Sequence, residues 1–402
     1  MDNKIDTNHP VIPSEEFSRR VAAVRGRMAA RGIDLVMAFS NLLDPSAVRY
    51  LCDFAAVNES AALILPLEGE ATVCSGQASY DYALVKNRLA DSVIKVFPEI
   101  GEVSGFEYDF GGQLDFAAYF EELKQKYSVK RIGIIGRLTF PAIIWNKLVQ
   151  VFDGAEMVDF DDELYAIRLK KSAAEIACMR KCSALVSDVF HKSVPEIRVG
   201  MNEREIQGLL EGEILRSGAE SYVQAFAPMV ATGPDNSYIS MCRNTLRKVQ
   251  ESEILNLAAG VCYEGYNGII CTPYVLGKVP QKIKDAVMCA YDALNVAASE
   301  LKPGVPAAKV LTAYTDYLTK RGYIEFCPYG SLHSTGLLEC EAPSFSLTNG
   351  RIIEENMTLC IDAYFKGMEW GSFRVEDCYV VNAKGAERMT TYNDRAIPKI
   401  FG

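Results

Sequence analysis

The stretch MTLCIDAYFKGMEWGSFRVEDCYVV (residues 357–381) contains two apolar segments, MTLCIDAYF and FRVEDCYVV, whose pattern predicts two β-strands. Successive side chains of a strand point to opposite faces of its sheet, so every second residue shares a face. Asp362 therefore lies on one face of the first segment, and Glu376 lies on one face of the second. The residues that share those faces are Cys360 and Tyr364 in the first segment, and Arg374 and Cys378 in the second.

The N-terminal part of the chain alternates helical and strand-like patterns, which predicts an α/β domain. The segment 15–32 has the apolar spacing of an amphipathic helix. We predict that this domain covers residues 1–163. The apolar face of the helix consists of Phe17, Val21, Val24 and Met28, and the expected strands are 33–39, 61–66, 71–74, 131–136 and 157–160.

The C-terminal part repeats one order of elements, two helices followed by two strands. Its first two helices begin at capping boxes, in which a cap residue precedes a glutamate by three positions. This repetition predicts a second domain, residues 164–402, built from duplicated helix–strand units. The capping pairs are Ser172 with Glu175 and Asn202 with Glu205, the later helices are expected at about 281–301 and 306–321, and the earlier strands at 253–259 and 266–277.

The composition of the 402-residue chain argues against several classes of protein. A net charge of −10 and a pI of about 5.1 disfavour nucleic-acid binding, which depends on clustered Lys and Arg. No apolar run reaches the roughly 18 residues of a membrane span, and the N-terminus lacks the apolar core of a secretory signal. The twelve cysteines form no CxxC pair, which indicates reduced core thiols. We therefore predict a cytoplasmic protein with no nucleic-acid or membrane partner.

Several segments resemble those of a known family, in the same order along the chain. The family is that of creatinase, aminopeptidase P and prolidase, whose C-terminal domain has the pita-bread fold. The resemblance spans nearly the whole chain and implies an α/β fold with an N-terminal creatinase-like domain and a C-terminal pita-bread domain. It also implies a homodimer, the usual state of such proteins. Beside the opening stretch, the segments are IDLVMAFSNLLDPSAVRYLCDF (33–54), ELYAIRLKKSAAEIACMRKCSALV (163–186), RVGMNEREIQGLL (198–210) and HSTGLLECEAP (333–343).

The resemblance assigns the family's metal positions to residues of this chain. Metallopeptidases of this family hold two metal ions with two Asp, one His and two Glu, and the ions generate a hydroxide and stabilise the developing oxyanion. The His position is His333, and the Glu positions are Asp362 and Glu376. The two Asp positions fall on Ala258 (or on Asn256, if the register is shifted by two residues) and on Ile269. Neither Ala nor Ile binds metal, so the resemblance implies that the dinuclear centre is lost.

The proton-shuttling histidines of the family are missing as well. One should lie near Ser240 or Met241, and a second falls on Cys340. The chain has three histidines, of which one lies in a polar N-terminal tail. We expect His191 to be a solvated residue on a helix surface. His333 is therefore the histidine that can serve a site.

These losses favour a metal-independent enzyme similar to creatinase. We predict a hydrolase, or a lyase, that acts on a C–N bond of a small polar nitrogenous substrate without a metal or other cofactor. His333 would be the general base. Two alternatives remain open. One is an Xaa-Pro aminopeptidase or dipeptidase with one divalent metal at His333, Asp362 and Glu376, and the other is a catalytically silent binding protein.

The remaining polar groups complete the predicted site. Asp362 or Glu376 could orient the ring of His333, and Cys271 could be a nucleophile, although packing is the ordinary role of such a cysteine. Arg374 could bind a substrate carboxylate or form an internal ion pair. The predicted catalytic residues are His333, Glu376, Asp362 and Cys271, and the predicted substrate-binding residues are Arg374, Tyr266, Asn236 and Glu341, whereas Glu339 is expected at the surface.

Overall fold

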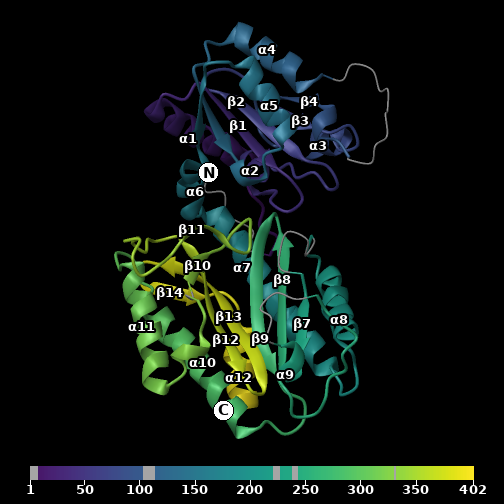
Figure 1. Ribbon diagram of the computed structural model, residues 1–402, viewed down its shortest axis with the longest axis vertical. Helices are drawn as coiled ribbons and strands as arrows, with labels where there is room; N and C mark the ends of the chain where they lie inside the picture. The colour runs from purple at the N-terminus through teal and green to yellow at the C-terminus, as the bar shows by residue number, and fades with distance from the viewer. Residues whose placement is uncertain (1–7, 103–113, 221–226, 238–242, 330–331) are drawn as a thin grey trace. The chain divides into compact units, whose positions relative to one another are not determined.

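The computed structural model describes residues 8–102, 114–220, 227–237, 243–329 and 332–402. The chain divides into two compact units (Figure 1). One unit is Ile12–Arg168, and the other is Leu169–Gly402 together with the residues up to Val11. Each unit has its own sheet and its own helices. The domain boundary between residues 163 and 164 stays a prediction.

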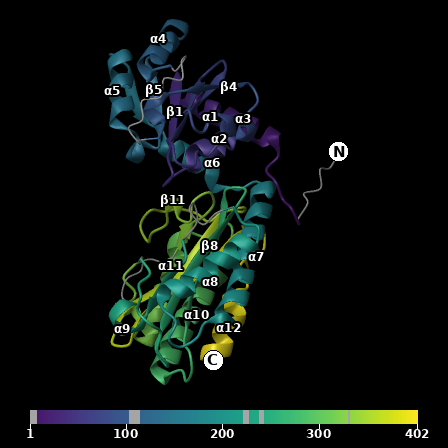
Figure 2. The same cartoon turned by 90° about the vertical axis from the view of Figure 1, so that its right-hand side faces the viewer.

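The unit Ile12–Arg168 is built on a six-stranded mixed sheet with helices on both faces (Figure 2). The central strand pairs in parallel with one neighbour and antiparallel with the other. The strand order is β4 (Ser92–Val96), β3 (Ala71–Ser75), β2 (Ala61–Pro66), β1 (Leu35–Ser40), β5 (Arg131–Ile135) and β6 (Glu156–Asp159). The helices are α1 (Ser14–Arg31), α2 (Ser46–Cys52), α3 (Tyr80–Lys86), α4 (Phe116–Lys126), α5 (Ala142–Val151) and α6 (Asp161–Leu169).

The packing of this unit follows its apolar pattern. The predicted face of α1, formed by Phe17, Val21, Val24 and Met28, is buried. Alternate residues of β1 join α4 and α5 in a core that is rich in phenylalanine. The one strand that the pattern does not predict is β4, whose five residues are all half-buried.

The unit Leu169–Gly402 is built on an eight-stranded sheet in which the described neighbours pair antiparallel. The opening stretch of the sequence forms its two longest strands. The strand order is β11 (Glu341–Ser344), β10 (Leu332–Ser334), β12 (Thr358–Met368), β13 (Gly371–Asn382), β9 (Tyr266–Tyr274), β8 (Leu255–Tyr263) and β7 (Met229–Thr232), and β14 (Gly385–Arg388) pairs with β13.

The helices of this unit confirm the predicted duplication. α7 (Ala173–Ser193) and α8 (Glu203–Arg216) precede β8 and β9, and α10 (Gln281–Glu300) and α11 (Ala307–Arg321) precede β12 and β13. α7 packs on β8 and β9, as α10 packs on β12 and β13. Both predicted capping boxes are formed. The short α9 (Gly233–Asn236) and the C-terminal α12 (Tyr392–Phe401) complete the unit.

One glycine sets how closely α7 approaches the sheet. A Cβ at Gly268 of β9 would lie 2.6 Å from the backbone of Cys182 in α7. The side chain of Cys182 also reaches the carbonyl oxygen of Tyr266, 3.0 Å away. The even-numbered residues of β9 therefore face α7, and its odd-numbered residues face the opposite side of the sheet, because side chains alternate along a strand.

Candidate active site

Four adjacent strands bring four of the predicted site residues together. Glu376 on β13 lies opposite Asp362 on β12 and opposite Cys271 on β9. Two residues away from Asp362 along β12, Cys360 lies opposite His333 on β10. Directly opposite residues of antiparallel strands project from the same face and are close enough to interact. The strand register thus places the site on the face of the sheet that does not carry α7.

His333 faces Glu376 and is held by two acceptors. Its Nε2 lies 3.2 Å from Oε1 of Glu376, and its Nδ1 lies 3.1 Å from the carbonyl oxygen of Ser334. Neutral imidazole has one N–H, so it can satisfy only one of these acceptors. Nε2 and the carboxylate therefore need a cation between them, either a proton or a metal ion. Burial lowers the pKa of His333, but contacts with Cys340 and Glu376 outweigh burial and hold the pKa well above its ordinary value.

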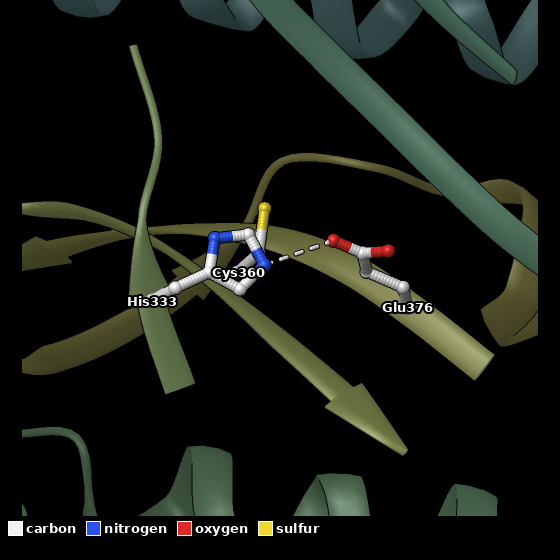
Figure 3. A group of neighbouring side chains, drawn as sticks. All are labelled: His333, Cys360 and Glu376. Carbon is white, nitrogen blue, oxygen red and sulfur yellow. Dashed lines mark hydrogen bonds and ion pairs between the residues drawn. The ribbon is translucent and has the colours of Figure 1, made fainter. Parts of the chain in front are cut away.

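A third donor atom lies beside this pair (Figure 3). A ring nitrogen of His333, Sγ of Cys360 and a carboxylate oxygen of Glu376 all lie within 4.8 Å of one another. The Cys360 thiol is buried against Sγ of Cys378, 3.3 Å away. Burial raises the pKa of Cys360 well above its ordinary value, so the thiol is neutral unless a cation is near. Imidazole, thiolate and carboxylate are the donors that zinc accepts in proteins.

Arg374 lies between the two carboxylates. Its guanidinium is 3.6 Å from Oδ2 of Asp362 and 3.5 Å from Oε2 of Glu376. Its Nε donates to Sγ of Cys271 at 3.2 Å, and that thiol donates to Glu376 at 3.1 Å. Arg374 is 5% exposed, so these contacts are buried and depend on one another. Of the two roles left open for Arg374, the structure contains the internal ion pair.

The two buried acids, Glu376 and Asp362, differ in pKa. Burial opposes ionisation of Glu376, but Arg374 and His333 hold its pKa at about 2. Burial raises the pKa of Asp362 to about 6, because the neighbouring Glu376 adds to burial and Arg374 offsets only part of it. Oδ2 of Asp362 accepts from the hydroxyl of Tyr329 at 2.9 Å. Among the described residues its Oδ1 is buried without a hydrogen-bond partner.

Cys271 lies in the cluster as a neutral thiol. It is fully buried, and burial raises its pKa well above the ordinary value, although Arg374 opposes the shift. A nucleophilic cysteine needs a lowered pKa and access to substrate. The contacts of Cys271 therefore favour a hydrogen-bonding role between Arg374 and Glu376, and its catalytic role stays a prediction.

Three of the side chains that were predicted to bind substrate form hydrogen bonds with other residues of the chain. None of these three hydrogen bonds involves a residue of the cluster around His333. Their roles toward a substrate stay predictions that the observed contacts do not support. The hydroxyl of Tyr266 donates to Glu175 (2.7 Å), the amide of Asn236 donates to Glu203 (2.6 Å), and Glu341 accepts from Lys171 (3.1 Å).

Glu339 lies at the site although its sequence position suggested the surface. Its Oε1 is 3.8 Å from Nε2 of His333, and its side chain is 16% exposed. Burial raises its pKa to about 7, and the charge of Glu376 adds to the shift. The pairing of β10 with β11 shifts register next to His333, so simple alternation does not predict which glutamate faces inward. The position of the missing histidine near Ser240 or Met241 lies outside the described residues.

Two family models match the chain in succession. The model described as metallopeptidase family M24 matches residues 177–383, just over half of the chain. The chain belongs to this family. The model described as the creatinase/prolidase N-terminal domain matches residues 20–170. An M24 member with this N-terminal domain has the fold that the sequence segments predict.

Relatives and solved structures agree with this membership. The Xaa-Pro dipeptidase of Pyrococcus horikoshii is 24% identical over 270 residues, which cover 67% of this chain and 76% of the relative. The prolidase structure from Pyrococcus horikoshii has a TM-score of 0.79 at 21% identity and covers 93% of this chain and 98% of that one. The X-Pro aminopeptidase structure from Thermotoga maritima has a TM-score of 0.79 at 20% identity, with coverages of 92% and 97%. These structural matches show the fold.

Membership of family M24 corrects two predictions. A metal-independent, creatinase-like hydrolase is the wrong prediction, because the family is one of metallopeptidases and the relatives are Xaa-Pro dipeptidases. The prediction that no metal cofactor is needed is wrong for the same reason. The broader prediction, an enzyme that hydrolyses C–N bonds, agrees with the family. The absence of Asp at Ala258 and Ile269 therefore does not exclude metal binding, and the alternative of a metal-dependent Xaa-Pro peptidase agrees better with the family.

Other predictions are tested only in part. Among the described residues, every helix is too short or too polar to cross a bilayer. The homodimer and the cytoplasmic location stay predictions. His191, expected to be solvated, is only partly exposed, and its Nε2 is buried without a hydrogen-bond partner in the described part of the chain.

Proposed function

We propose that this chain is a metal-dependent peptidase that hydrolyses Xaa-Pro dipeptides with one divalent ion held by His333, Glu376 and Cys360. The observation that carries the proposal is the convergence of three donor atoms within 4.8 Å. Three protein ligands that leave one position open for water are typical of catalytic zinc sites. The substrate class comes from the relatives, which are named Xaa-Pro dipeptidase and X-Pro aminopeptidase.

The donor set fits one ion rather than two. The resemblance puts the family's two Asp positions on Ala258 (or Asn256) and on Ile269, and none of these side chains is a carboxylate. The guanidinium of Arg374, 3.5 Å from Oε2 of Glu376, offsets one negative charge of the cluster, which leaves less charge for a second cation. Asp362, the third ligand expected from the resemblance, is turned toward this guanidinium. Cys360 takes its place in the proposed site.

A bound divalent ion would lower the pKa of a water molecule and polarise the peptide carbonyl. The chain supplies the positioning. The carbonyl of Ser334 accepts from Nδ1 of His333, which fixes the ring and leaves Nε2 for ligation. Arg374 keeps Glu376 ionised and therefore able to ligate. Glu339, 3.8 Å from Nε2 of His333, is placed to accept a proton from water and to donate it to the leaving proline nitrogen.

Metal content and dipeptide hydrolysis together test the proposal. The purified full chain should contain about one zinc, manganese, iron or cobalt ion per chain and should hydrolyse Ala-Pro. A chelator should stop hydrolysis, and one of these ions should restore it. His333→Ala should lose both the ion and the activity, whereas Lys320→Ala, a change at an exposed position of α11, should keep both. A chain that hydrolyses no Xaa-Pro dipeptide with any of these ions added would contradict the proposal.

A matched pair of variants identifies the third ligand. Cys360→Ser should lower metal occupancy, because a neutral hydroxyl is a weaker ligand than a thiolate. Asp362→Asn should leave occupancy close to that of the parent chain. The opposite pattern would assign the third position to Asp362.

A further inference from the structure

A pocket lies on the side of the sheet that carries α7, in the unit Leu169–Gly402. It has a volume of about 410 Å³ and is bounded by the end of α7, the one-turn helix η3 (Val194–Glu196), the end of β9 and α12. α12 packs against α7 and β9 (Figure 2). Tyr274, which lines the pocket, projects from β9 on the face opposite to Cys271. The pocket is therefore separate from the site around His333.

The charged groups of this pocket are all cationic. Arg395 and Lys399 lie one helical turn apart on α12, and both are exposed. Within the described part of the chain neither forms an ion pair, although the protein carries a net charge of −10. The nearby acid Asp394 is paired with Arg388 at 2.5 Å. A single face of α12 thus presents two positive charges that the fold leaves available.

The ring of His191 adds a further aromatic surface to the pocket. It stacks edge-on against Tyr392, with ring centroids 5.0 Å apart, and both residues line the pocket. Nε2 of His191 is buried and has no hydrogen-bond partner among the described residues. Because this atom is buried, a molecule in the pocket would contact the ring of His191 rather than its Nε2.

The remaining wall of the pocket is apolar. Two tyrosine rings form it together with aliphatic side chains of η3 and α12, and this lining matches the body of an aromatic or branched ligand. The volume is within the range of small-molecule sites, roughly 300–1,000 Å³. The apolar lining consists of Val194, Pro195, Ala396 and Ile400, together with the rings of Tyr274 and Tyr392.

We propose that this pocket binds a small amphipathic carboxylate. Arg395 and Lys399 bind its carboxylate, and the rings of the tyrosines and of His191 enclose its apolar body together with the aliphatic side chains. A carboxylate fits the guanidinium through paired hydrogen bonds. A neutral ligand of the same shape would leave both cations unpaired, and a cationic one would be repelled.

Calorimetric titration of the full chain with 4-phenylbutyrate and with 4-phenylbutanamide tests the proposal. The two probes share shape and apolar body and differ in charge. We expect the carboxylate to bind at least about tenfold more tightly than the amide. Equal affinities, or no binding of the carboxylate at millimolar concentration, would overturn the proposal.

Two matched double variants locate the binding. Arg395→Gln with Lys399→Gln should weaken 4-phenylbutyrate binding about tenfold or more and leave binding of the amide unchanged. Arg351→Gln with Lys320→Gln removes the same two charges at exposed positions outside the pocket and should bind as the parent chain does. Ala396→Leu, which fills the pocket, should weaken both probes. Unchanged carboxylate binding in the first double variant, at an unchanged melting temperature, would overturn the proposal.

Discussion

Breaking the ion pair between Lys171 and Glu341 should destabilise the unit Leu169–Gly402 by several kcal/mol. Nζ of Lys171 lies 3.1 Å from Oε2 of Glu341, and both side chains are only 2% exposed. The other oxygen of Glu341 accepts from the backbone N–H groups of Leu337 (2.7 Å) and Leu338 (3.2 Å). The same carboxylate therefore holds the turn that follows β10, and with it the strand that carries the proposed histidine ligand.

Each single substitution leaves one charge of the pair buried without its partner. Lys171→Met leaves the Glu341 carboxylate buried without its cation, which costs about 3–5 kcal/mol for a buried pair. Glu341→Gln keeps an acceptor for the two N–H groups but leaves the ammonium uncompensated, so a similar cost is expected. The double variant leaves no charge unpaired. It should cost less than the sum of the single variants by about 2 kcal/mol.

Urea unfolding followed by circular dichroism measures these costs from the midpoint and slope of the transition. The neighbouring pair of Lys170 and Glu354 provides a matched control, because its side chains are 55% and 46% exposed. Lys170→Met should therefore change the free energy of unfolding by less than about 1 kcal/mol. A loss in Lys171→Met no larger than in this control, at an unchanged slope, would refute the reasoning.

Three further predictions concern other buried groups. Asn393→Ala should cost about 2 kcal/mol in urea unfolding, because the buried amide donates to the carbonyls of Cys271 (3.0 Å) and Glu376 (3.1 Å); a cost near zero would contradict this. Iodoacetamide should modify exposed Cys340 before buried Cys271, and timed labelling read by peptide mass spectrometry shows the order. Burial raises the pKa of Asp161, so the folded state binds this proton more tightly than the unfolded state, and stability falls as pH rises through its titration range. Asp161→Asn should accordingly lose less stability than the parent chain between about pH 4 and about pH 7 in the same unfolding assay.

The elements that could be predicted from the sequence are those with strong local signals. α7 and α8 begin at capping boxes, and the predicted apolar face of α1 is the face that is buried. β4 could not be predicted, because its residues are uniformly half-buried and give no alternation of apolar and polar side chains. β10 and β11 are only three and four residues long, too short for a periodic pattern to develop.

The residues of the candidate site also fall into those that could be predicted from the sequence and those that could not. His333 and Glu376 could be predicted because their segments match family motifs, and the structure places them 3.2 Å apart. Cys360 could be placed on the right face by alternation, but its approach to His333 depends on the register between β10 and β12, which the sequence does not encode locally. Glu339 was missed because a register shift beside His333 changes which residues face inward.

The charges of the site support the proposal of one ion rather than two. Asp362 and Glu376 lie opposite each other on β12 and β13 and are almost fully buried, so they need nearby positive charge. Arg374 supplies one charge, 3.6 Å from Asp362 and 3.5 Å from Glu376. With Ala258 and Ile269 contributing no negative charge, a second divalent ion would leave the cluster with excess positive charge. The position between His333 and Glu376 still needs a cation. One divalent ion at this position would bind Nε2 of His333 and the carboxylate of Glu376 together.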